Sequence, residues 1–166
     1  MKQKGFTFIE LVIVIVILGI LSVTAATKFI NLQRDARISA LQGLKGEMTG
    51  AVNQLHPKAI LAGIDTQVSA AITIEGDTIA IVYGYPKADA ANTWNHLMNQ
   101  TFVDSQFHPE IPSDWYFHNN NNSTGLSYIR FMHKSKKKSS DDCYVKYTEA
   151  KDENTLPIFE FVSTGC

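Results

Sequence analysis

The stretch Lys4-Gly5-Phe6-Thr7-Phe8-Ile9-Glu10 and the aliphatic run from Leu11 to Leu21 that follows it decide how this chain is organised. Glu10 is the single charged residue between Phe8 and Ala26. A helix of that length spans roughly 28 Å, which is enough to cross the hydrocarbon core of a bilayer. A carboxylate within lipid costs about 3 kcal/mol at the centre and less near the interface. We therefore expect Glu10 to have a function and a cationic partner.

Three kinds of N-terminal segment share this pattern. In an ordinary secretory signal peptide, Lys2 and Lys4 form the basic region and Thr24-Ala25-Ala26 forms the cleavage site. A plain membrane anchor keeps the whole segment. A prepilin leader is cut before the apolar run, which then stays on the mature protein. We favour the third interpretation, because Glu10 fits poorly in a signal-peptide core and helical sequence follows the small residues directly.

The segment 4–10 resembles the leader and mature N-terminus of type IV pilins and of type II secretion pseudopilins. Gly5, Phe6 and Glu10 stand at the spacing of that family. The resemblance implies that a prepilin peptidase/methyltransferase cleaves between Gly5 and Phe6 and methylates the new amine of Phe6. It also implies that Glu10 is the assembly carboxylate. The implied partners are this enzyme, the inner membrane before assembly, and identical or related pilin subunits in a helical polymer.

Further segments resemble the mannose-sensitive haemagglutinin (MSHA) group of pilins, and Gly165-Cys166 at the C-terminal end fits that group too. The segments are Leu18-Gly19-Ile20-Leu21, Phe29-Ile30-Asn31-Leu32-Gln33, Leu41-Gln42-Gly43-Leu44-Lys45 and Tyr83-Gly84-Tyr85-Pro86. The resemblance implies a structural subunit of an extracellular type IV pilus that serves surface attachment or cell adhesion. A type II secretion pseudopilin is the alternative. A secreted binding domain or enzyme whose mature chain starts near Thr27 is a third hypothesis.

Thr27 departs from the family pattern, in which a proline often occupies this place. A proline inside a helix removes a hydrogen bond and kinks the helix, whereas threonine does neither. The kink that the resemblance implies at this position is therefore in doubt.

Composition and cysteine placement bound the rest of the chain. Its 166 residues and net charge of -1 allow one modest domain besides the N-terminal helix. There is no basic excess of the kind that a dedicated nucleic-acid-binding protein carries. If Lys2 and Lys4 stay in the cytoplasm, the remainder is exported to an oxidising compartment, where Cys143 and Cys166 are expected to form a disulfide.

Helical periodicity continues beyond the apolar run, with apolar residues at three- and four-residue steps as far as Leu55. Pro57 should end or kink this helix, and 58–63 forms a resumed turn. We divide the chain into a leader (1–5), a transmembrane and filament-core helix (6–27), an amphipathic continuation (28–62) and a globular head (63–166) whose disulfide closes residues 143–166.

The head is expected to be rich in strands. Two short strands flank a Gly76-Asp77 turn, Ala88 to Gln100 forms a short helix with Asp89 as its cap, and Phe102 to Pro112 is irregular. Four strands joined by polar loops then form an antiparallel meander: Trp115–His118, Leu126–Met132, Cys143–Thr148 and Pro157–Val162. The expected fold is α+β, a pilin fold whose long N-terminal helix packs on a four-stranded antiparallel sheet. This pairing also brings Cys143 close to Cys166.

No catalytic or cofactor-binding constellation is evident, so neither an enzyme nor a cofactor nor a metal is expected. The five histidines show no metal-ligand spacing, and Asp141-Asp142 reads as a solvated pair more readily than as a calcium site. The basic run from Lys134 to Lys138 is interpreted as a solvated loop, with a patch for DNA or glycans as the alternative. The concentrated aromatic residues, interpreted as core or as a binding surface, are Trp94, Trp115, Tyr116 and Phe117.

Overall fold

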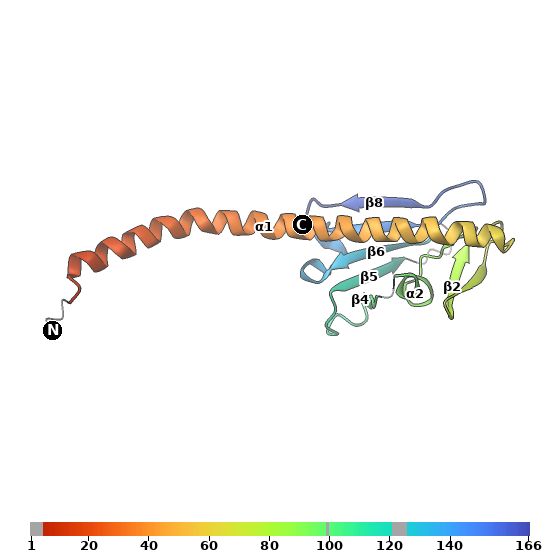
Figure 1. Ribbon diagram of the computed structural model, residues 1–166, viewed down its shortest axis with the longest axis horizontal. Helices are drawn as coiled ribbons and strands as arrows, with labels where there is room; N and C mark the ends of the chain where they lie inside the picture. Colours follow the sequence, from red (N-terminus) through yellow and green to blue (C-terminus); the bar gives the residue numbers. More distant parts are fainter. Residues whose placement is uncertain (1–4, 99, 121–125) are drawn as a thin grey trace. The chain divides into compact units, whose positions relative to one another are not determined.

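The computed structural model describes residues 5–98, 100–120 and 126–166, without the side chains of residues 26, 27 and 30. It divides into two compact units, Met1–Ala36 and Arg37–Cys166, which are described separately (Figure 1). Lys2, Lys4, most of the predicted loop from Asn119 to Gly125 and the side chain of Thr27 lie outside the described residues.

Helix α1 covers Phe8–Leu61 and supplies the described helical part of the first unit. Within the described residues, its segment Phe8–Ala25 is the one stretch of helix long and apolar enough to cross a membrane. The aliphatic side chains there are exposed; Ile13, for example, exposes 52% of its surface. Valine and isoleucine favour strands in water, but in lipid a helix satisfies every backbone hydrogen bond within the segment.

In the second unit, α1 buries one stripe of side chains against the head. Its buried members lie three or four residues apart and are Leu41, Leu44, Met48, Val52, Leu55 and Ala59. This is the spacing of one helix face. The members from Leu41 to Val52 join the core formed by Ile129, Phe131, Val145 and Tyr147 of the larger sheet. Leu55 and Ala59 join a second cluster with Ile79 and Ile81 of the smaller sheet.

Of the two outcomes predicted at Pro57, an end or a kink, the helix does not end there but continues to Leu61, close to the predicted boundary at residue 62. Leu55 and Ala59 are fully buried on either side of the proline, and this packing offsets the lost hydrogen bond. Two residues beyond the helix end, Gly63 has a positive φ, and the N–H of Ile64 donates to the carbonyl of Ala59 at 3.1 Å. This Schellman arrangement satisfies carbonyl groups that the helix end leaves free.

The predicted four-stranded antiparallel sheet is wrong in its strand number and in its purely antiparallel character. The larger sheet has five strands in the order β4-β5-β6-β7-β8, namely Val103–Asp104, Trp115–Asn120, Tyr128–His133, Tyr144–Thr148 and Ile158–Val162. Strand β4 pairs with β5 in parallel, and the other neighbours are antiparallel. A strand of two residues is too short to show the alternation of apolar and polar residues that predicts a strand. The stretch from Phe102 to Pro112, which contains β4, was therefore expected to be irregular.

A second sheet contains β1 (Ala70–Ile74), β2 (Asp77–Val82) and β3 (Tyr85–Pro86). The first turn is formed by Glu75 and Gly76, both with positive φ, rather than by the predicted Gly76-Asp77 pair. Tyr83 and Gly84 form the second turn, also with positive φ, and β2 ends just before them at Val82. Two-residue turns of this kind match the twist of a hairpin.

The predicted short helix near Trp94 is present in a shorter form. A π-helical turn, Ala90–Trp94, leads into α2, Asn95–Leu97. Asp89 caps the turn, and its Oδ1 accepts a hydrogen bond from the N–H of Asn92 at 3.1 Å. Trp94 is fully buried and meets the ring of Tyr147 edge-on at 4.8 Å, so this segment covers the core of the larger sheet.

Candidate functional site

The N-terminus of α1 holds Thr7 and Glu10 in a reciprocal pair of hydrogen bonds. The main-chain N–H and the hydroxyl of Thr7 each donate to Oε2 of Glu10 at 2.7 Å. In return, the N–H of Glu10 donates to Oγ1 of Thr7 at 3.3 Å. This is a capping box, in which the residue before a helix and the third residue inside it satisfy each other's free donors.

The capping box gives Glu10 a local partner that the sequence analysis missed. The signal was visible, because Thr-x-x-Glu before an apolar run is the sequence pattern of a capping box. Among the described residues, the hydrogen bonds to the carboxylate come from the neutral hydroxyl and amide of Thr7, so none of these bonds neutralises its negative charge. In the unprocessed chain Phe6 follows Gly5 and has an amide nitrogen; cleavage between them would create an amine four residues from Glu10.

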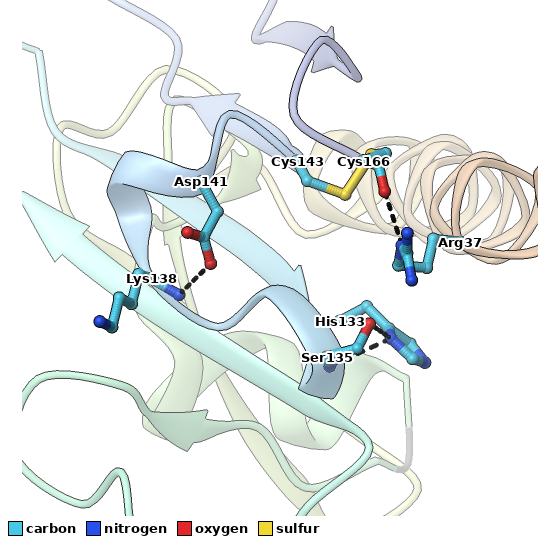
Figure 2. The surroundings of a disulfide bond; sticks show 7 residues. All are labelled: Arg37, His133, Ser135, Lys138, Asp141, Cys143 and Cys166. Atoms are coloured by element: carbon cyan, nitrogen blue, oxygen red, sulfur yellow. Dashed lines mark hydrogen bonds between the residues drawn. A yellow bond between two sulfur atoms is a disulfide. The ribbon is translucent and has the colours of Figure 1, made fainter. Parts of the chain in front are cut away.

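A second predicted feature, the disulfide, lies at the end of the head where α1 enters it. Cys143 and Cys166 are bonded, with 4.8 Å between their Cα atoms, and both are buried. The antiparallel pairing of β7 and β8, in which Tyr144 faces Val162, brings the two cysteines together. Figure 2 shows Arg37 of α1 beside this bond, with its Nε donating to the main-chain oxygen of Cys166 at 2.7 Å.

Gly165 allows the C-terminal end of the chain to pack closely against the loop that contains Asp141 and Asp142. Its N–H donates to the carbonyl of Asp142 at 3.0 Å. A Cβ at position 165 would overlap the main-chain oxygen of Asp141, and a rigid backbone cannot move aside cheaply. Glycine is therefore needed here for a close approach of two backbone segments.

The basic run from Lys134 to Lys138 forms a short loop with two single turns of 3-10 helix, Lys134–Lys136 and Ser139–Asp141. Lys134 forms an ion pair with Asp114 at 2.7 Å, which lowers the pKa of the aspartate and raises that of the lysine. Asp141 accepts a hydrogen bond from the N–H of Lys138, as Figure 2 shows. Asp141 therefore has a local structural role in this loop.

His133 precedes this loop and lies against Trp115, with ring centroids 5.6 Å apart. Burial lowers the pKa of His133, and the charges of Lys134 and Arg37 lower it further, while Asp114 opposes them. The imidazole therefore favours its neutral form. Its Nδ1 lies 2.9 Å from the hydroxyl of Ser135.

The other predicted candidates are dispersed. His56 stacks on Tyr85, with centroids 4.1 Å apart, and His96 lies 3.4 Å from Asp77. Across the described parts of the chain, no three histidine, cysteine or acidic residues are grouped so that they could hold a metal ion. Trp94 and Tyr116 are buried, and Trp115 and Phe117 pack on the main core, in keeping with the interpretation of these aromatics as core and sheet residues.

The N-terminal segment is similar to a known protein-family motif. Residues 1–26 match the prokaryotic N-terminal methylation motif. No curated protein and no solved structure is similar enough to the whole chain to count as a match. The matched residues include the capping box and the apolar start of α1. A motif of this kind implies that a prepilin peptidase processes the N-terminus. The methylation motif and the apolar helix that follows it indicate a type IV pilin-like or pseudopilin-like protein.

Proposed function

We propose that this protein is the structural subunit of an extracellular type IV pilus, closest to the MSHA group. The observation that carries the proposal is the methylation motif at residues 1–26, joined to an apolar helix whose side chains are exposed. Such a helix needs an apolar environment outside its own chain. The inner membrane provides it before assembly, and the helices of neighbouring subunits provide it in the filament.

The proposed processing removes residues 1–5 and methylates the amine of Phe6. Glu10 then pairs with the amine of a neighbouring subunit, which neutralises a charge in an apolar filament core and sets the axial register. The capping box supports this role, because the hydrogen bonds from Thr7 hold the carboxylate at the helix end without neutralising it. No enzymatic step is part of the proposal, in keeping with the structural roles typical of proteins with this motif.

The alternative is a pseudopilin of a type II secretion machine, which shares the same N-terminus. The disulfide that closes residues 143–166 and the resemblance of 83–86 to MSHA pilins favour the pilus. Surface attachment or cell adhesion follows from that resemblance. The remaining hypothesis, a secreted domain behind an ordinary signal peptide, would place the mature N-terminus near Thr27.

An intact-mass measurement on protein from its native cells tests the processing. The expected chain starts at Phe6, is one methyl group heavier than the unmodified chain, and gains two hydrogens on reduction of the disulfide. A chain that starts near Thr27 would remove the apolar helix and refute assembly through it.

Deletion of the gene separates the pilus from the pseudopilus. We expect the mutant to lose surface filaments and attachment while it still secretes its exoproteins. Complementation with the wild-type gene should restore the filaments. Normal filaments together with a loss of exoprotein secretion would instead assign the chain to the secretion machine.

A further inference from the structure

Among the described residues, Lys136 and Lys138 form no ion pair at one end of the head, and the acidic side chains of Glu75 and Asp77 lie at the other. Each end also holds charge of the other sign, namely Asp141 and Asp142 in the lysine loop and Lys58 beside the acidic pair. The loop from Lys134 to Lys138 lies at the end where α1 enters the head, beside Arg37 and the disulfide (Figure 2). At this end, within the described chain, no carboxylate lies within ion-pair distance of the ammonium groups of Lys136 and Lys138. The side chain of Lys138 points away from the disulfide in Figure 2.

The β1–β2 turn lies at the other end of the head. Glu75 and Asp77 line a hollow together with Leu55 and Lys58 from the last turns of α1. Glu75 is exposed and, within the described residues, forms no ion pair. Asp77 lies 3.4 Å from the imidazole of His96, which lines the same hollow.

The two charged ends are too far apart to meet within one molecule. Between Arg37 and Leu61, α1 is roughly 36 Å long at about 1.5 Å per residue. Figure 1 likewise places the segment after β6 and the β2 hairpin at opposite ends of the head. An exposed lysine and an exposed glutamate at this separation are screened from each other, because the screening length in physiological salt is about 8 Å.

We propose that Lys136 and Lys138 of one copy of this chain meet Glu75 and Asp77 of the next copy. The contact joins different surfaces of identical molecules, so it does not close on itself and repeats along an open filament. This inference rests on the proposed assembly of subunits into a surface pilus. A single exposed ion pair contributes little, but reversal of one partner places like charges opposite each other at every repeat.

Charge reversal in full-length protein expressed in the native cells tests the contact. We expect Lys138→Glu alone and Glu75→Lys alone each to reduce sheared surface filaments about tenfold at low salt. The double variant Lys138→Glu/Glu75→Lys should restore them, because every repeat again pairs opposite charges. Lys45→Glu, which changes the charge of α1 away from both ends, serves as the matched control.

Two further measurements distinguish a failure of the proposed contact from a failure of the proposed function. Intact mass must show leader cleavage in every variant, and the wild type must form filaments; a wild type without filaments refutes the proposed function itself. Unchanged filaments in both single variants overturn the contact alone. A loss that the double variant fails to restore also overturns it, and would direct attention to a partner other than a second copy, such as DNA or an anionic membrane.

Discussion

The two portions of α1 differ in where their apolar side chains lie. Leu32 in the first unit exposes 62% of its surface, whereas Leu41, nine residues further along, is fully buried in the head. After Arg37 the buried apolar residues form one stripe, which the two sheets of the head cover. Before Ala25 they surround the helix, and no single surface of the same chain can cover all sides. The apolar side chains after Arg37 are therefore covered by the head of the same chain, whereas those before Ala25 require lipid or the helices of other subunits to cover them.

The largest expected effect comes from Glu10, the one charge in the apolar portion. We expect Glu10→Ala to leave leader cleavage intact but to reduce assembly to a small fraction of the wild-type amount, because the charge that pairs with a neighbouring amine is lost. Immunoblots of sheared surface filaments, beside intact mass of the membrane fraction, measure both properties. Abundant normal filaments from this mutant would contradict the role of Glu10, and Lys45→Ala controls for the loss of a charge elsewhere on α1.

A pair of leucine substitutions tests the comparison directly. Leu41→Ala should lower the free energy of unfolding by roughly 3 to 4 kcal/mol, because it leaves a cavity in the core. Leu32→Ala should lower it by less than about 0.5 kcal/mol, because its side chain is exposed in the isolated subunit. Chemical unfolding of the full chain in detergent measures both. Equal losses would show that residues before Arg37 also belong to the folded core.

Removal of the disulfide should have a slightly smaller effect. The chain-entropy model gives about 3 kcal/mol for the loop closed between Cys143 and Cys166. We expect the double variant Cys143→Ser/Cys166→Ser to be less stable by about that amount, measured as a shift in urea midpoint. The wild type under reducing conditions is the matched control. If neither shows a shift, the contact of Arg37 with the main chain of Cys166 is sufficient to hold this end.

The smallest expected effect concerns Glu149, whose carboxylate accepts a hydrogen bond from the N–H of Ala88 at 2.7 Å. Burial raises the pKa of Glu149, and Asp89 raises it too, against the lowering effects of the Ala88 amide and Lys87. Because the folded pKa lies above the unfolded one, the folded state binds the proton more tightly. The stabilisation that this proton gives is fully present below the unfolded pKa and is lost as pH rises through the folded pKa.

Glu149→Gln removes this titration but keeps an oxygen that can accept the hydrogen bond. The stability of the wild type relative to Glu149→Gln should therefore fall as the pH rises above the usual glutamate pKa, by less than about 1 kcal/mol. Urea unfolding at a series of pH values measures the difference. A difference that stays constant with pH would show that Glu149 ionises normally in the folded protein.

The parts of this fold that could be predicted from the sequence are those with a regular spacing of apolar residues or with strands that follow one another in the chain. The stripe on α1, strands β5 to β8 and the disulfide follow from repeated apolar spacing and from the order of the strands. Strand β4 is too short to have a period, and its parallel pairing depends on where the chain from Trp94 returns to the sheet. The helix continues through Pro57 because tertiary packing outweighs a local penalty, and such packing has no local sequence signal.

At the candidate site, the spacing of Gly5, Phe6 and Glu10 predicts the motif that matches residues 1–26. Thr7 could have been predicted as well, from the capping-box pattern. The requirement for glycine at position 165 could not, because it depends on a backbone carbonyl twenty-four residues earlier in the sequence. Arg37 also escaped prediction, since its hydrogen bond is made to a main-chain oxygen at the far end of the chain.

The way in which α1 is held in the head has a mechanical consequence. From Leu41 to Ala59 its buried stripe lies against the core, and in Figure 1 this part of the helix runs along the direction of β6 and β8. Traction along the helix axis therefore loads these contacts in shear, so that all of them must slide at once. Force across the axis would instead peel them apart one turn at a time. The head resists tension best along its own helix.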